Sequence, residues 1–129
     1  MTKITFTMTL ALCLLLVLGG AARAQAKKDP CDNAQTQVEL NECQAREYKK
    51  ADAALNTVYK QLMAKIDDEG ERTALKNAQL AWIKFRDADC EFEAYQNKGG
   101  TIYPLIYDGC LTTLTRARTK ELNDLLHNR

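Results

Sequence analysis

Apolar or small side chains recur every three or four positions between residues 40 and 66, which is the spacing of one face of an α-helix. Asp32 or Asn33 is expected to cap the start of this first helix. Gly70, in the sequence DDEG, is expected to end it in a left-handed conformation. The stripe comprises Leu40, Gln44, Tyr48, Ala51, Leu55, Val58, Tyr59, Leu62 and Ile66.

Two further helices follow from the same periodicity. The second is expected from about Glu71 to Tyr95, and the third begins near Asp108. Each has one apolar stripe that should face a shared core. The stripe of the second helix contains Leu75, Ala78, Trp82, Phe85 and Phe92. That of the third contains Leu111, Leu114, Leu122 and Leu125.

The segment QNKGGTIYPLIYDG interrupts this periodicity with Gly99, Gly100 and Pro104. It predicts a structured loop over residues 96–107, and loops of about this length often carry function. No alternating strand pattern of any length occurs along the chain. The sequence therefore predicts the all-α class, as an antiparallel three-helix bundle.

The first residues have the pattern of a secretory signal peptide, with Lys3 ahead of the apolar run 10–18 and a small-residue stretch behind it. An A-x-A motif favours cleavage after Ala24, with Ala26 as the alternative. The predicted domains are a signal peptide, 1–24, and one helical domain, 25–129. Cys13 lies inside the apolar run, so it does not form a lipoprotein motif. We expect a periplasmic or secreted protein without a membrane anchor after cleavage.

Charge gives little indication of a partner. The chain has 18 basic and 17 acidic residues. Cleavage after Ala24 removes Lys3 and Arg23, which leaves 16 basic against 17 acidic residues and a net charge of −1. A balance this close to zero argues against nucleic-acid binding and strong electrostatic steering.

Four cysteines remain after cleavage, Cys31, Cys43, Cys90 and Cys110. An even number in an oxidising compartment predicts two disulfides. Their spacing contains no C-x-x-C pair and the only histidine is near the C-terminus, so we expect no metal site and no cofactor. Helical geometry places Cys43 and Cys90 on opposite flanks of the first two helices. It favours Cys31–Cys90 and Cys43–Cys110, although sequence alone does not fix the connectivity.

A polar seam is expected beside Trp82, formed by Asp52, Asn56, Gln79 and Arg86. When residues are mirrored across the connection between the first two helices, Asp52 and Arg86 lie level and on the same flank. The favoured interpretation is structural, because an arginine–carboxylate pair can fix the register of two helices. The seam offers no nucleophile, histidine base or second matched carboxylate. We therefore expect that the protein is not an enzyme.

Five segments occur in order along the chain: CDNAQTQVELNEC (31–43), ADAALNTVY (51–59), LKNAQLAWIKFRDADC (75–90), GGT (99–101) and CLTTLTRARTKEL (110–122). Together they resemble the LprI-type lysozyme-inhibitor family. The resemblance implies a small secreted helical domain with a protein partner, and a lysozyme is the expected candidate for that partner.

Inhibition of this kind would act by steric occlusion of the cleft that binds the sugar chain. The candidate contact residues lie in the 96–107 loop and are Lys98, Gly99, Gly100, Tyr103 and Tyr107. An alternative is that the glycines only turn the chain and the tyrosines pack on the core. The alternative function is that of an immunity or envelope-stress protein with a different, unknown protein partner.

Overall fold

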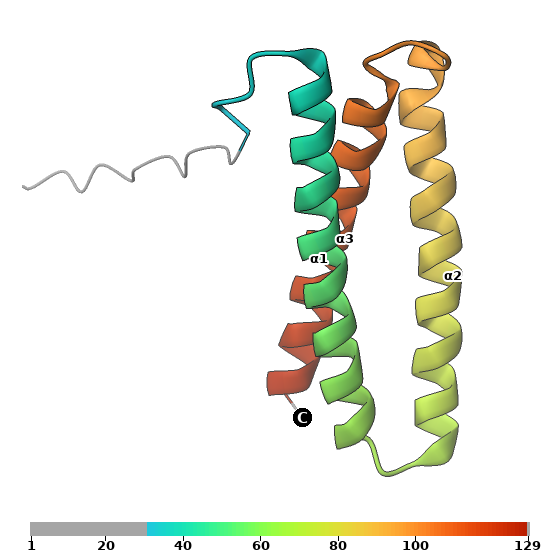
Figure 1. The fold of residues 1–129 in the computed structure, drawn as a ribbon. Helices are drawn as coiled ribbons and strands as arrows, with labels where there is room; N and C mark the ends of the chain where they lie inside the picture. The colour runs from blue at the N-terminus through green and yellow to red at the C-terminus, as the bar shows by residue number, and fades with distance from the viewer. Residues whose placement is uncertain (1–30, 129) are drawn as a thin grey trace, which may run out of the picture.

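The computed structural model describes residues 31–128, so the predicted signal peptide lies outside the described residues. α1 is Gln37–Lys65, α2 is Glu69–Ala94, the short 3-10 helix η1 is Tyr95–Asn97, and α3 is Tyr103–His127. The three long helices run up and down beside one another (Figure 1). The predicted all-α class and three-helix antiparallel architecture are confirmed. No helix in the described range is long and apolar enough to span a membrane.

The start and end of α1 differ from the expectation. Thr36, not Asp32 or Asn33, is the N-cap, because its hydroxyl accepts the Glu39 N–H at 3.2 Å while the Glu39 carboxylate accepts the Thr36 N–H at 3.0 Å. Gly70 does not end α1 but lies in the first turn of α2. Asp68 caps α2 by accepting the Glu71 N–H at 2.7 Å.

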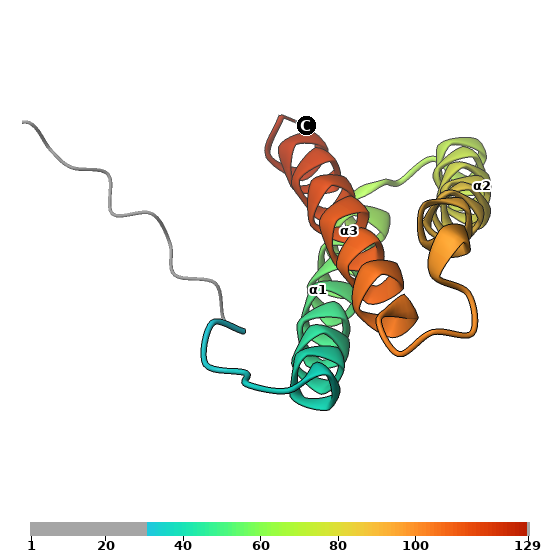
Figure 2. The same cartoon turned by 90° about the horizontal axis from the view of Figure 1, so that it is seen from above.

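The core consists of two clusters along α3, which packs against both other helices and most extensively against α1 (Figure 2). The larger cluster, near the α1–α2 connection, contains Leu55, Leu62, Ile66 and Leu122, with Leu75, Trp82 and Leu126 against it. The smaller one, near the α2–α3 connection, contains Cys90, Cys110 and Leu111. The stripe predicted for the first helix supplies much of this core, and Ala51, Leu55, Leu62 and Ile66 are all buried.

The stripe predicted for α2 is partly wrong. Phe85 and Phe92 are 58% and 81% exposed, and Ala78 is exposed as well. The buried residues of α2 are instead Gln79, Arg86, Cys90 and Ala94. The reason is that α2 carries apolar residues on two sides, and the disulfide and the Arg86 contacts select which side faces inward. Leu125 of α3 is likewise 44% exposed, and its neighbour Leu126 packs on the core instead.

Both predicted disulfides form, but their expected pairing is wrong. The bonds are Cys31–Cys43 and Cys90–Cys110, with Cα–Cα distances of 5.8 and 5.5 Å. Cys43 and Cys90 do not pair, as expected. The expected pairing assumed that Cys110 lies in the first turn of the third helix. Because α3 begins at Tyr103, Cys110 lies about two turns into it and level with Cys90.

The early start of α3 also shortens the expected 96–107 loop. Pro104 lies in the first turn of α3 rather than in the loop. Proline is well tolerated there because the first helical N–H groups have no partner within the helix. Residues 98–102 and η1 therefore form the whole connection between α2 and α3.

Candidate functional site

The end of the bundle formed by η1 and residues 98–102, called the loop end below, has an exposed surface of mixed character. Tyr95 is 58% exposed and Ile102 is 40% exposed. Between them, Lys98, Gly99 and Gly100 are also exposed. Apolar, cationic and bare backbone groups thus lie within a few residues of one another in the loop end, whose ribbon is at the top of Figure 1.

The backbone of the loop end is held in place by a series of hydrogen bonds. The Gly100 N–H donates to the Asn97 carbonyl at 2.9 Å, and Asn41 Nδ2 of α1 donates to the Thr101 carbonyl at 2.8 Å. Gly99 has a φ of 82°, which favours glycine. A Cβ on Gly100 would approach the Asn97 oxygen to 3.1 Å. The turn therefore favours glycine at both positions, and its hydrogen bonds hold this surface in a pre-formed conformation.

Of the residues predicted for this loop, Lys98 and Tyr103 both contact Glu91 of α2. Lys98 Nζ lies 2.7 Å from Glu91 Oε1, and the Tyr103 hydroxyl donates to the other oxygen of the same carboxylate. These bonds, that of Lys98 first, lower the pKa of Glu91. The bond to Glu91 raises the pKa of Tyr103 to about 12.

Tyr103 and Tyr107 stack with ring centroids 5.8 Å apart, and both are partly buried. The structure therefore divides the five predicted loop residues into two groups. Lys98 and the two glycines face solvent, whereas the tyrosines pack along α3. Sequence reasoning overlooked Tyr95 and Ile102, although their position next to the Gly-Gly turn was a signal that they would be exposed.

The residues of the predicted polar seam lie between α1 and α2. Arg86 is only 6% exposed, and its Nη1 is 3.8 Å from Asp52 Oδ1. Its closest carboxylate, however, is the adjacent Asp87, at 2.7 Å from Nη2. Asn56 Nδ2 donates to Asp52 at 2.9 Å. Arg86 thus sits between two half-exposed carboxylates.

The polar seam also includes residues of α3, which the sequence did not indicate. Arg86 Nη1 donates to Thr115 Oγ1 at 3.3 Å, and Arg118 Nε donates to Gln79 Oε1 at 3.2 Å. The Arg86 guanidinium lies 5.2 Å from the Trp82 ring centroid. A pocket of about 220 Å³ opens beside these groups, lined by Asp52, Leu55, Asn56, Tyr59, Lys76, Gln79, Leu80, Ile83 and Arg86.

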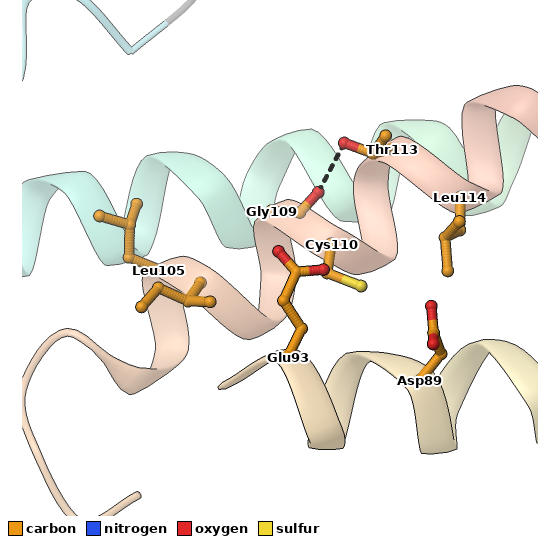
Figure 3. Close-up of a pocket in the computed structure, with 8 residues that line it drawn as sticks. Asp89, Glu93, Leu105, Gly109, Cys110, Thr113 and Leu114 are labelled. Carbon is orange, nitrogen blue, oxygen red and sulfur yellow. Dashed lines mark hydrogen bonds between the residues drawn. The ribbon is translucent and has the colours of Figure 1, made fainter. Parts of the chain in front are cut away.

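A second pocket, of about 330 Å³, lies between α2 and α3 beside the Cys90–Cys110 bond. Its α2 side carries the carboxylates of Asp89 and Glu93, which point toward α3 (Figure 3). Its α3 side is mainly apolar, with Leu105, Ile106 and Leu114. Neither Asp89 nor Glu93 has an ion pair in the part of the chain that the structure describes. The pocket is therefore suited to a cationic side chain with an apolar stem.

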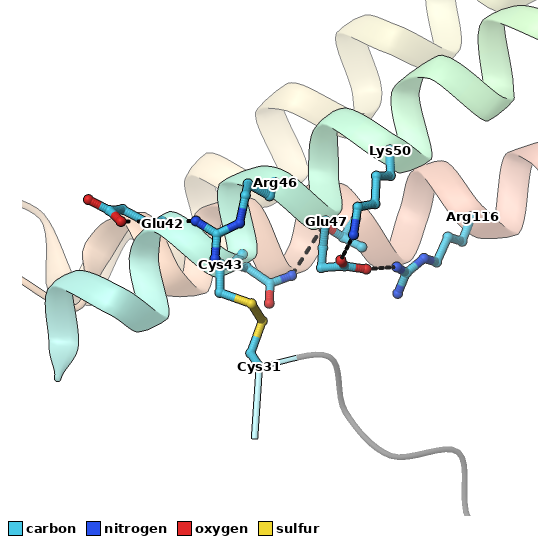
Figure 4. The surroundings of a disulfide bond; sticks show 9 residues. Cys31, Glu42, Cys43, Arg46, Glu47, Lys50 and Arg116 are labelled. Atoms are coloured by element: carbon cyan, nitrogen blue, oxygen red, sulfur yellow. Dashed lines mark hydrogen bonds and ion pairs between the residues drawn. A yellow bond between two sulfur atoms is a disulfide. The ribbon is translucent and has the colours of Figure 1, made fainter. Parts of the chain in front are cut away.

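A third polar group lies at the α1–α3 interface, where the Glu47 side chain is only 8% exposed. Lys50 Nζ and Arg116 Nη2 each lie 2.7 Å from one of its oxygens (Figure 4). The hydrogen bond from Lys50, followed by its charge and by the hydrogen bond and charge of Arg116, holds the pKa of Glu47 below its usual value. Glu47 therefore links the two helices that share the largest interface.

None of these groups has the arrangement of a metal centre. Across residues 31–128, no cluster of three or more His, Cys, Asp or Glu side chains is arranged to hold a metal ion. The seam and the two pockets provide charged and apolar surfaces.

Comparison with known proteins gives three similarities. The family described as "Lysozyme inhibitor LprI" matches residues 29–122. An uncharacterised protein of Rhizobium meliloti strain 1021 is 39% identical over 130 residues, covering 92% of this chain and 94% of the relative. A crystal structure of a DUF1311 family protein from Pseudomonas putida KT2440 aligns with a TM-score of 0.68 and 23% identity. It covers 75% of this chain and 100% of that one. This last similarity concerns the fold alone.

Proposed function

This chain belongs to the LprI lysozyme-inhibitor family, and from that premise we propose that it is an extracytoplasmic binding protein that blocks a peptidoglycan-cleaving enzyme. It would do so by covering the cleft in which the enzyme holds its sugar chain. Two disulfides support a location in an oxidising compartment. The absence of catalytic machinery expected from the sequence fits a role in binding.

The observation that carries this proposal is the pre-formed, exposed loop end. Rigid aromatic and apolar side chains at the centre of a contact usually supply most of its binding energy. Tyr95 and Ile102 provide such anchors, and the hydrogen-bonded turn at Gly99 and Gly100 holds them in place. A surface ordered before contact loses less conformational entropy when it binds.

Lys98 would contribute charge to the same contact. Glycoside hydrolases use a pair of carboxylates in their cleft, so an inserted cation meets complementary charge. The Lys98 side chain is 62% exposed, and the side chain of Glu91, with which it forms an ion pair, is 41% exposed. An ion pair this exposed contributes little to stability, so Lys98 is free to exchange partners. Tyr103 and Tyr107, which are partly buried on α3, would then support the loop end without contacting the enzyme.

A lysozyme clearance assay tests this proposal with oxidised residues 25–129 against chicken-type, goose-type and invertebrate-type enzymes. We expect dose-dependent inhibition of one class. Tyr95→Ala and Ile102→Ala should each weaken it at least tenfold, and Lys98→Glu should weaken it as well. Lys60→Glu, an identical charge change at an exposed position of α1, is the matched control and should leave inhibition unchanged. Absence of inhibition of all three classes at micromolar protein would overturn the proposal.

The second candidate is an immunity or envelope-stress protein with a different protein partner. The net charge of −1 expected after signal cleavage favours it, because such a surface would steer weakly toward a strongly basic enzyme. Affinity capture from periplasm with the oxidised chain, compared with the Tyr95→Ala variant, would decide. One specific partner that is not a lysozyme, lost in the variant, would support this candidate.

A further inference from the structure

The outer face of α2 carries a continuous seam of exposed apolar residues. The intervals along it alternate between four and three residues, which is the heptad spacing of a coiled coil. No charged residue interrupts the series. This outer seam consists of Ala74, Ala78, Ala81, Phe85, Ala88 and Phe92, and all six are exposed.

No part of residues 31–128 covers the outer seam. The opposite face of α2, with Gln79, Arg86 and Cys90, is the one buried against the other helices. Phe85 and Phe92, at 58% and 81% exposure, are therefore held in solvent by the same packing that buries an arginine. A contiguous apolar strip of this kind on a folded protein marks a surface that associates with another.

Large and small side chains alternate along the outer seam in a pattern that fits itself. In an antiparallel pair of α2 helices centred on residue 83, Phe85 lies level with Ala81 of the second copy, and Phe92 with Ala74. The remaining positions, Ala78 and Ala88, also lie level with each other. Each phenylalanine thus meets an alanine, which is the large-to-small complementarity that packs a core without gaps. A parallel pair would instead place Phe against Phe and leave gaps between alanines.

From this self-complementarity we propose that the chain forms a twofold dimer through antiparallel α2 helices. The seam runs for about 27 Å at 1.5 Å per residue. Four phenylalanines that each bury about 150 Å² supply on the order of 600 Å². The alanines and neighbouring side-chain stems bring the total toward the lower limit of stable interfaces, about 1,200 Å². The dimer is therefore reversible, and because the seam is uncharged it persists at high salt.

Sedimentation equilibrium of oxidised residues 25–129 measures the association directly. We expect a monomer–dimer equilibrium in the micromolar range. Phe85→Glu should weaken it at least tenfold without changing the helical circular dichroism, since Phe85 is 58% exposed and belongs to neither core cluster. Leu80→Glu is the matched control, because Leu80 is also exposed on α2, at 51%, but lies outside the seam. A monomer at all concentrations, or equal loss in both variants, would overturn the proposal.

Engineered cysteines test the direction of the pair. Ala78→Cys and Ala88→Cys should cross-link with each other when the two variants are mixed, because these positions are level only in the antiparallel arrangement. Neither variant should cross-link alone. Covalent dimers of Ala78→Cys alone would show a parallel pair and contradict the proposal. Lysozyme inhibition by the Phe85→Glu variant is a separate readout, so failure of the dimer and failure of the proposed inhibitory function are distinguishable.

Discussion

The two faces of α2 reverse the usual relation between polarity and burial. The inner face buries an arginine and a glutamine, whereas the outer face exposes two phenylalanines. Burial of a charge is unfavourable unless its partners are in place. For Arg86 these partners are Asp87, Asp52 and Thr115, together with the Trp82 ring. The comparison shows that specific contacts, not total hydrophobicity, set the rotation of this helix.

The largest effect should come from breaking the Cys90–Cys110 bond, which fixes the inner face of α2 against α3. Replacing both cysteines by alanine should lower the free energy of unfolding by about 2 to 5 kcal/mol, the usual range for a native disulfide in a small domain. Urea denaturation measures this loss.

The Cys31–Cys43 bond provides the comparison, because it attaches only the short segment before α1. The two bonds close loops of 20 and 12 residues. Loop entropy alone makes them differ by only about 0.5 kcal/mol. A larger difference between the two losses of unfolding free energy would therefore measure the packing around Cys90, which is fully buried. Equal losses for the two double variants would contradict a special role for Cys90–Cys110 in orienting α2.

Truncation of Arg86 should have the next largest effect. Arg86→Ala should destabilise the fold by about 2 to 3 kcal/mol, somewhat less than for a fully buried pair because both carboxylates remain half exposed. Arg86→Met keeps the packing between Trp82 and Tyr48, and should recover most of this loss. Chemical denaturation of both variants separates packing from charge. A change below about 0.5 kcal/mol for Arg86→Ala would show that Arg86 does not anchor α2.

The sequence predicted the helices, and the stripe of α1 in particular, because one face of that helix is apolar throughout. It could not predict the rotation of α2, since Ala78, Phe85 and Phe92 continue the apolar stripe beside Trp82, whereas the buried face also contains the polar Gln79 and Arg86. The expected disulfide pairing is wrong for a different reason. An expected loop that includes Pro104 makes the third helix begin near Asp108, too late to bring Cys110 level with Cys90, whereas α3 begins at Tyr103.

The polar seam, too, could be predicted only in part from the sequence. The proximity of Asp52 and Arg86 depends only on register across the short α1–α2 connection, which periodicity defines well. Thr115 and Arg118 belong to α3, and their part in the seam requires the position of a third helix. The spacing of Thr36 and Glu39, in contrast, matches a capping box without any tertiary information, and the expectation of Asp32 or Asn33 as the cap overlooked it.

Glu47 extends the comparison to a second buried charge, at the α1–α3 interface. Its pKa is lowered in the folded state, so its contribution to stability is present above the pKa of the unfolded chain, near 4.5. That contribution is lost as the pH falls through the lower, folded-state value. Glu47→Gln should therefore reduce the loss of stability between pH 5 and pH 3, as measured by thermal unfolding across that range. Glu42→Gln, at an exposed position, is the control and should leave the loss of stability between pH 5 and pH 3 unchanged.

The smallest effect on the monomer should come from the outer face of α2. Phe92→Lys replaces a side chain that is 81% exposed, so at concentrations below the dimerisation range the free energy of unfolding should change by less than about 0.5 kcal/mol. Comparison with Arg86→Ala, six residues earlier on the buried face of α2, directly measures how far polarity and burial are reversed on this helix. If the same variant lowers the unfolding temperature only at high protein concentration, the stabilising contact of Phe92 lies in the dimer, because association stabilises by mass action. A large loss at every concentration would instead place Phe92 against the core of the protomer.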